Sequence, residues 1–532
     1  MGNIHDAAHL YCIRRGACED HMGILSEISS RSDPSQKSLQ GSQGRRSVMM
    51  GSSKLSVSLA LALVSSVALA ACATIDSTPD APSVTQNDRV SAARQHPQIL
   101  QQFGGAVEGP LGTYVSSVGE RVARAAGVPG QCTFSVVNTD VVNAFAVPGC
   151  YIYITRGLLA IMNSEDELAS VLGHEVGHVV ADHAARRQNT ATLAGLGAII
   201  AGVATGSGEI AQAAGQAGQL YSLNYSRDQE YESDDLGVRY LGATGYNPFA
   251  AGDMLRALGV NDELAARTSN RAVNATPTWA RTHPMSADRI TRANANAQAT
   301  GATRDNPPEN ARAYLEAVRG MIYGDDPEQG FVNDRTFAHP GMRIAFEAPS
   351  GASLTNTPSA VIVRGQNLQA QFSGGALQGD LNAYAANVMR GVLGQTPAQM
   401  GQAQRGTTNG LETVTLPARV QNSQGQVLEV VVTAYRLGDR AYHFVAVAPQ
   451  GGMGAAASMT RSFRQISEQE ATALRARQIS LVTVGARDTA QSLANRMAFD
   501  TFQLERFLAL NGLESATALR VGQIVKLVTY VR

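Results

Sequence analysis

The sequence predicts an α+β protein of several domains, with a mainly helical region first and strand-rich regions after it. Apolar residues recur at helical spacing around 110–126 and 248–258, and strand-like runs dominate after Thr300. About 460 of the 532 residues follow an N-terminal apolar run, which is enough for two or three domains. With 44% hydrophobic and 16% charged residues and a net charge of −1, the composition is that of a globular protein and gives no sign of nucleic-acid binding.

A predicted export signal lies near the N-terminus. Residues 55–69 form an apolar run behind three basic residues. The run is shorter than the about 20 residues that a membrane span needs, so we interpret residues 49–71 as a signal peptide. The sequence Leu-Ala-Ala-Cys at 69–72 resembles a bacterial lipobox, which implies cleavage before Cys72, a lipid on its thiol and, with Ala73 next, the outer membrane. Ordinary cleavage beside an incidental cysteine is the alternative.

The segments on either side of this signal lack a folded pattern. Residues 1–48 are polar and precede the signal, so we interpret them as a doubtful leader and expect Met49 or Met50 to be the true start. Residues 72–90 form a predicted tether, because 76–87 is rich in Pro, Ser, Thr and Asp.

Cysteine usage agrees with export. Of the five cysteines, two lie in the leader and one is Cys72, so Cys132 and Cys150 remain. In an oxidising periplasm we expect a disulfide between these two, and two unpaired buried thiols are the alternative.

The residues His174-Glu175-Val176-Gly177-His178 predict a metal site on one helix. Residues i and i+4 share a helix face, so both imidazoles can reach one ion. Glu175 lies beside them, where a carboxylate can take a proton from water at the metal, and this spacing is the zinc-protease signature. Ser164 and Glu167 predict a capping box at the start of the helix. A core helix that merely contains two histidines is the alternative.

The third ligand is expected on a second helix. Ala184 stands where a metzincin would have its third histidine, and His183 is one residue off that register, so we interpret His183 as a helix-end histidine. Glu230 and Asp234 lie at i and i+4 in a later acidic segment, where one can ligate the metal while the other accepts a hydrogen bond from a ligand histidine. A solvated acidic helix face is the alternative.

Taken in order, these motifs resemble metallopeptidase family 48, a clan MA gluzincin family. The resemblance implies a zincin-type domain at 91–300 that holds one Zn²⁺ through His174, His178 and Glu230. It also implies Glu175 as general base and Asp234 as the carboxylate that orients a ligand histidine. Cys150 departs from the family, which usually has a second Gly there. The matching stretches are His174–His178, Ser226–Asp234, Gly245–Pro248, Thr282–Pro284 with Arg289-Ile290, Asn143–Gly149 and Gly157–Leu159.

Three further features bear on the substrate. Residues 141–154 have the composition of β structure, and we expect an edge there to pair with an extended substrate through Asn143, Ala144, Phe145 and Ala146. His283 precedes a proline and is a candidate either to steady the oxyanion or to fill the fourth metal position, with a surface-turn histidine as the alternative. The Ala- and Gly-rich segment 190–220 is interpreted as a helical hairpin over the cleft, with an ordinary helix pair as the alternative.

Two regions follow the metal-site region. A linker containing Pro307-Pro308 and a short helix at 314–321 lead into a predicted α+β domain, 310–470, with strand-like runs at 343–346, 360–363, 427–435 and 442–447. Because this domain shows no catalytic constellation, scaffold and substrate docking are both open.

The tail, 478–532, resembles a βααβ LysM module, which implies attachment to peptidoglycan. Arg487 stands where that family usually has Gly, which puts glycan binding in doubt. A degenerate copy that only packs on the middle domain is the alternative.

The sequence therefore predicts a zinc-dependent metalloendopeptidase of the bacterial periplasm, anchored by lipid to the outer membrane. Its expected substrates are misfolded or mistargeted envelope proteins. The alternative is a latched or inactive metal-site protein that acts as an envelope chaperone or binding module. The complete set of metal ligands and the base favours the enzyme, since a retired enzyme can lose its base and keep its ligands.

Overall fold

The computed structural model describes residues 84–188, 225–268, 279, 283, 287–304, 311–422 and 425–531. All of them belong to the compact unit Ser77–Arg532. The predicted leader, signal peptide and Cys72 lie outside the described residues, as do the 190–220 segment and Pro307-Pro308. Among the described helices, none combines the length and the apolar character that crossing a membrane requires.

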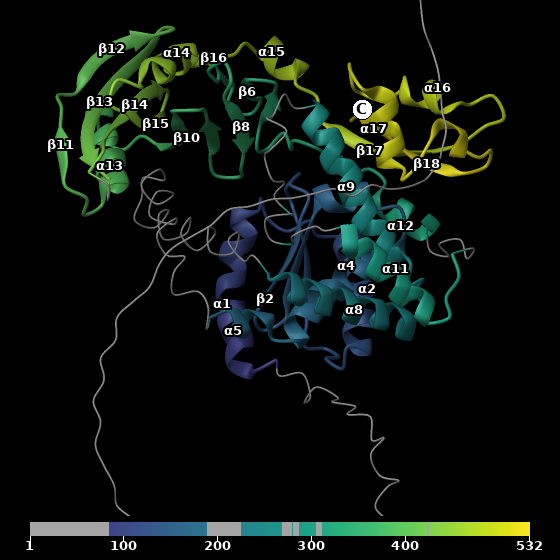
Figure 1. The fold of residues 1–532 in the computed structure, drawn as a ribbon. Coiled ribbons are helices and arrows are strands. Elements are labelled where there is room, and N and C mark those ends of the chain that lie inside the picture. The colour runs from purple at the N-terminus through teal and green to yellow at the C-terminus, as the bar shows by residue number, and fades with distance from the viewer. Residues whose placement is uncertain are drawn as a thin grey trace, which may run out of the picture. The chain divides into compact units, whose positions relative to one another are not determined.

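The first region is a small sheet with helices packed around it (Figure 1). Its strands are β1 (Thr133–Val137), β2 (Ala144–Val147) and β3 (Tyr151–Thr155). The strand order is β1-β3-β2, with β1 parallel and β2 antiparallel to β3, so β2 lies at an edge of this sheet. The predicted helix at 110–126 and the predicted β structure at 141–154 are confirmed. The helices are α1 (Gln86–Gln102), α2 (Pro110–Ala125), α3 (Arg156–Ile161), α4 (Glu165–Val180), α5 (His183–Gln188), α8 (Arg227–Thr244), α9 (Ala250–Thr268) and α11 (Ala287–Ala299).

A disulfide joins Cys132 to Cys150, as the sequence predicts. It ties the residue before β1 to the turn before β3. Cys150 has a φ of 61°, in the left-handed region where glycine is favoured. A cross-linked cysteine therefore occupies a backbone conformation that glycine adopts without strain.

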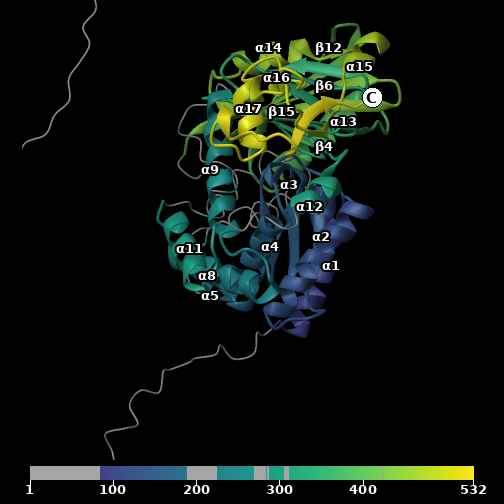
Figure 2. The same cartoon turned by 90° about the vertical axis from the view of Figure 1, so that its right-hand side faces the viewer.

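Helix α4 is positioned by its N-terminal cap and by close helix contacts. The Ser164 hydroxyl accepts from the amide of Glu167, but the Glu167 carboxylate accepts from the amide of Asn163 instead of completing the predicted box. A Cβ added at Gly173 would lie 3.4 Å from the Cα of Gly237, and one at Gly177 would lie 3.3 Å from the Cα of Ser233. These small residues let α8 approach α4 closely, and Figure 2 shows α4 between α2 and α8.

Two sheets form the middle region. An eight-stranded sheet has the order β11-β13-β14-β15-β10-β9-β8 with β12 paired to β13, and a four-stranded sheet has the order β16-β7-β6-β5. The predicted strand-like runs fall on β7, β9, β14 and β15, and α13 packs against β13 and β14. The elements are β5 (Phe331–Asn333), β6 (Thr336–His339), β7 (Ile344–Glu347), β8 (Ser353–Asn356), β9 (Val361–Arg364), β10 (Gln369–Ala376), α13 (Leu381–Leu393), β11 (Ala398–Met400), β12 (Gln404–Thr408), β13 (Leu411–Gln421), β14 (Val427–Leu437), β15 (Arg440–Pro449), α14 (Gly454–Ser462), β16 (Arg464–Gln465) and α15 (Glu468–Ala473).

The tail has the strand–helix–helix–strand order that the sequence predicts, while its identity as a LysM module stays a prediction. Its elements are β17 (Arg477–Thr483), α16 (Ala490–Ala494), α17 (Gln503–Leu510), the 3-10 turn Ala516–Ala518 and β18 (Ile524–Tyr530). Strand β17 also pairs with β4 (Ile322–Tyr323), which follows α12 (Ala311–Val318).

This tail packs on the helices of the first region, and not on the middle region as the alternative interpretation of the tail expected. Phe507 and Leu527 share one apolar core with Leu159 and Leu168. Lys526 is fully buried, and its Nζ donates to the carbonyl oxygens of Ala160 and Met162 at the end of α3. Burial lowers the pKa of Lys526 to about 7. The tail therefore completes the core beneath the metal-site helix.

Replacement of Lys526 by Ala is expected to destabilise the first region by about 2–4 kcal/mol, because it removes a buried stem and leaves two carbonyl groups without their donor. Thermal unfolding of the full chain measures this loss. Arg520→Ala, at an exposed position of the same tail, is the control. Equal unfolding temperatures for the two variants would show that the tail does not support that core.

Candidate metal centre

Three candidate ligands converge from two helices. His174 and His178 lie one turn apart on α4, and their Nε2 atoms are 3.0 Å apart. Glu230 on α8 places Oε2 3.6 Å from His174 Nε2 and Oε1 3.5 Å from His178 Nε2. One ligand atom from each of these residues and from His283 lies within 4.8 Å of the other three. The structure thus brings together the three residues that the family resemblance implied as metal ligands.

The local sequence explains why α8 lies against α4. Ser226 and Gln229 form a complete capping box at the start of α8, and Gly245 ends the helix in the left-handed conformation. The next two residues bind the first turn of α4. The Tyr246 hydroxyl donates to Glu165 over 2.6 Å, and the Asn247 amide donates to Asp166 over 2.9 Å. The Gly-Tyr-Asn-Pro motif therefore clamps the end of α8 to the start of the metal-site helix.

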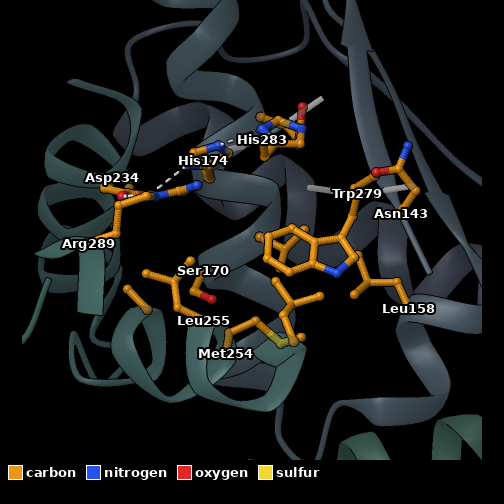
Figure 3. Close-up of a pocket in the computed structure, with 16 residues that line it drawn as sticks. Asn143, Leu158, Ser170, His174, Asp234, Met254, Leu255, Trp279, His283 and Arg289 are labelled. Carbon is orange, nitrogen blue, oxygen red and sulfur yellow. Dashed lines mark hydrogen bonds and ion pairs between the residues drawn. The ribbon is translucent and has the colours of Figure 1, made fainter. Parts of the chain in front are cut away.

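Asp234 and Arg289 hold the ligands in place. Asp234 Oδ1 lies 3.0 Å from His174 Nδ1, the ring nitrogen that faces away from the other ligands. Arg289 on α11 donates to both oxygens of Asp234 over 2.8 Å (Figure 3). Its Nη1 also lies 2.6 Å from Glu230 Oε2. Burial alone would raise the pKa of Asp234 and that of Glu230. Arg289 outweighs burial at Asp234, and His283 together with Arg289 outweighs it at Glu230, so both pKa values lie below their usual range.

Glu175 is buried beside this cluster. Its Oε1 lies 3.5 Å from His283 Nε2, and its Oε2 has no hydrogen-bond partner among the described residues. Burial raises the pKa of Glu175, while His283 and His174 act in the opposite direction. A buried carboxylate with a raised pKa and an open oxygen is suited to accept and return a proton.

The donor set fits zinc. Two imidazole nitrogens and one carboxylate oxygen are a common protein ligand set of catalytic Zn²⁺ sites, which keep a further position for water or substrate. Nothing in the cluster supplies the thiolates of a structural zinc site, because the two cysteines of the described part are joined to each other.

An apolar pocket adjoins Glu175 and His174. Asn143 and Ala144, at the start of β2, also line it (Figure 3). Of the other predicted substrate-strand residues, Phe145 packs against Phe103 and Tyr153, and Ala146 lies in the main core. The apolar part of the lining is Leu158, Val171, Met254, Leu255, Leu258 and Trp279.

Sequence reasoning missed two contributors to the site. Arg289 belongs to a quoted motif, but nothing in its spacing showed that it pairs with two carboxylates on α8. His183 was interpreted as a histidine at the end of the metal-site helix, but α4 ends at Val180 and His183 is the first residue of α5. Its Nδ1 lies 2.7 Å from Nδ1 of His178. Its position five residues after His178 was the only sequence feature that could have indicated this contact.

Comparisons of the sequence with known proteins point to peptidases. The family described as Peptidase family M48 matches residues 112–297. The chain is 33% identical over 216 residues to a Vibrio cholerae protein described as a beta-barrel assembly-enhancing protease, covering 39% of this chain and 42% of that protein. It is 31% identical over 229 residues to the beta-barrel assembly-enhancing protease of Yersinia pestis, covering 41% and 45%. It is 29% identical over 198 residues to the mitochondrial metalloendopeptidase OMA1 of Schizosaccharomyces pombe, covering 36% and 56%. The chain thus spans less than two thirds of the length of each relative.

Proposed function

Because this chain belongs to peptidase family M48 through residues 112–297, we propose that it is a zinc-dependent metalloendopeptidase. His174, His178 and Glu230 would hold one Zn²⁺ per chain. The observation that carries the proposal is the convergence of these side chains from α4 and α8 beside a buried Glu175. This arrangement favours an enzyme over an inactive chaperone, because the base is present together with the ligands.

The mechanism follows from the positions of the protein groups. When bound, zinc supplies a Lewis acid that polarises a peptide carbonyl and lowers the pKa of water. Glu175 takes the proton from the attacking water and returns it to the leaving amine, which is general base and then general acid catalysis. Asp234 holds the Nδ1 side of His174, so that Nε2 stays directed at the ligand cluster.

An extended substrate is proposed to pair with the free edge of β2. Two observations support this orientation. Strand β2 has a partner on one side only among the described strands, and Asn143 and Ala144 line the same pocket as Glu175. Main-chain pairing holds a peptide without selecting most of its side chains. Broad sequence tolerance is therefore expected, with Asn143, Ala144, Phe145 and Ala146 supplying the backbone.

His283 is proposed as the fourth ligand of a resting state. Its Nδ1 lies 3.0 Å from Glu230 Oε1 and 3.3 Å from His174 Nε2, within the ligand cluster. Burial lowers the pKa of His283, but Glu230 and Glu175 outweigh burial and leave it raised. A role in steadying the oxyanion requires the ring to leave the ligand cluster and face the substrate carbonyl.

The relatives suggest where the enzyme works. Two of them are named for enhancing beta-barrel assembly, so we propose misfolded or mistargeted envelope proteins as substrates. We further propose a periplasmic location, with Cys72 as a lipid anchor in the outer membrane and the tail as a module for peptidoglycan. These assignments rest on the sequence motifs and the relatives.

The proposed chemistry is tested by removing the metal. Purified protein is expected to contain one zinc per chain and to degrade unfolded casein. Dialysis against a chelator should remove both the zinc and the activity, and one equivalent of Zn²⁺ should restore both. Casein cleavage by protein shown to be metal-free would refute the proposal.

A further inference from the structure

A chain of contacts leads from His178 away from the ligand cluster. Nδ1 of His178 lies 2.7 Å from Nδ1 of His183, and Nε2 of His183 lies 3.1 Å from Glu232 Oε2. The same carboxylate oxygen accepts from Nη1 of Arg186 over 2.9 Å. His183 is fully buried, whereas the Glu232 side chain is 44% exposed. This series of contacts therefore connects a candidate metal ligand to a carboxylate at the surface.

Hydrogen bonding allows only one arrangement of protons along this chain when His178 ligates through Nε2. A nitrogen that binds a metal carries no proton, so the single proton of neutral His178 must be on Nδ1. The contact between the two Nδ1 atoms then requires His183 to accept there. The proton of His183 is consequently on Nε2, where it is donated to Glu232. The proton position on His178 thereby determines the proton position on His183.

The backbone holds His183 in the position that these hydrogen bonds require. Asp182, between α4 and α5, has a φ of 51°, which turns the chain so that the next residue folds back towards α4. The Gln229 side chain donates to the carbonyl oxygen of His183 over 3.2 Å, so α8 secures this position. Tyr225 stacks on the other face of His178, with ring centroids 3.6 Å apart and planes inclined by 13°. The His178 ring is thus fixed both in its plane and at its edge.

We propose that His183 is a positioning residue for metal binding, which fixes the tautomer and the ring plane of His178, with Glu232 as the final acceptor. Asp234 lies directly at Nδ1 of His174, whereas Glu232 acts on Nδ1 of His178 through the ring of His183. The inference rests on the proposed zinc site and extends it to two residues that hold no metal themselves. Hydrogen-bond partners of ligand histidines typically change metal affinity by 10- to 100-fold when they are lost.

Two substitutions at His183 separate positioning from packing. His183→Leu fills much of the space but removes the acceptor, and His183→Asn places an amide oxygen close to the position of Nδ1. Zinc affinity is measured by competition with a chromophoric chelator. We expect about 10- to 100-fold weaker binding for His183→Leu and recovery to within about threefold of wild type for His183→Asn.

Variants of Glu232 and of His96 complete the zinc-binding experiment. Glu232→Ala should weaken zinc binding, and Glu232→Gln, which keeps an oxygen acceptor, should weaken it less. His96→Leu on α1, outside the metal centre, should bind zinc as wild type does. In zinc-loaded protein, nitrogen-15 NMR should report a protonated Nδ1 on His178 in wild type and in His183→Asn.

The zinc affinities distinguish failure of the inference from failure of the proposed function. Equal zinc affinity for wild type and His183→Leu, or a loss in His183→Asn as large as in His183→Leu, would overturn the inference and leave the proposed enzyme intact. A wild-type protein that binds no zinc at all would instead overturn the proposed function.

Discussion

Glu175→Gln is expected to lower kcat for casein cleavage by about 10²- to 10⁴-fold, the range in which general acid–base catalysis contributes. The amide cannot accept a proton from water or return one to the leaving amine. Gln is nearly the same size as Glu, so the buried site should keep its shape. Zinc content should stay at one per chain because Glu175 is not among the clustered ligands.

The measurement is single-substrate kinetics on protein of known zinc content. Glu120→Gln on α2, which removes a carboxylate outside the site, is the matched control and should cleave as wild type does. If Glu175→Gln cleaves casein as fast as wild type, the enzyme hypothesis is wrong. The chaperone alternative would then account for the buried cluster.

Arg289→Met is expected to destabilise the zinc-free protein by about 3–5 kcal/mol, because it leaves two buried carboxylates without their cation. Asp234 and Glu230 are 7% and 1% exposed, and Arg289 contacts both. Arg289→Lys should recover only part of the loss, since an ammonium group cannot bind both oxygens of Asp234 and also reach Glu230. Chemical denaturation with and without zinc measures the effect.

The same substitution should change the pH dependence of stability. In wild type the lowered carboxyl pKa values contribute stability that is present above the unfolded values near 4 and is lost as pH falls through the folded values. Without Arg289 the two folded pKa values rise, so protonation at pH 5 relieves part of the repulsion. The deficit of the variant should therefore be smaller at pH 5 than at pH 8.

Arg292→Met is the control for this prediction. Arg292 lies one turn further along α11, pairs with Asp235 and has a side chain that is 48% exposed. Exposed pairs contribute about 0–1 kcal/mol, so this variant should unfold close to wild type. A loss as large as that of Arg289→Met would mean that the helix, and not the buried pair, is responsible.

Local periodicity predicted the two residue pairs at the centre of the site, and the family resemblance assigned Glu230 as the third ligand. The spacing from His174 to His178 and from Glu230 to Asp234 places each pair on one helix face. These are short-range properties, which a helix expresses wherever it lies. The strand–helix–helix–strand order of the tail was predicted differently, from its resemblance to a LysM module.

Contacts between distant segments could not be predicted in this way. Arg289 reaches Asp234 across 55 positions, and Glu232 reaches His183 across 49. Neither residue differs in its local pattern from an arginine or a glutamate on a solvated helix face. Likewise, a lysine within a strand gives no sign that it is buried, and Lys526 is buried only because another region covers it.

The burial of Lys526 has a consequence for the timing of synthesis. Its Nζ binds the oxygen of Ala160 across 366 positions. Ribosomes add about 5–20 residues per second, so β18 is made roughly 20–70 s after α3. During this interval the nascent chain contains α4 without the strand that completes the apolar core beneath it. That core can therefore be completed only after β18 has been translated.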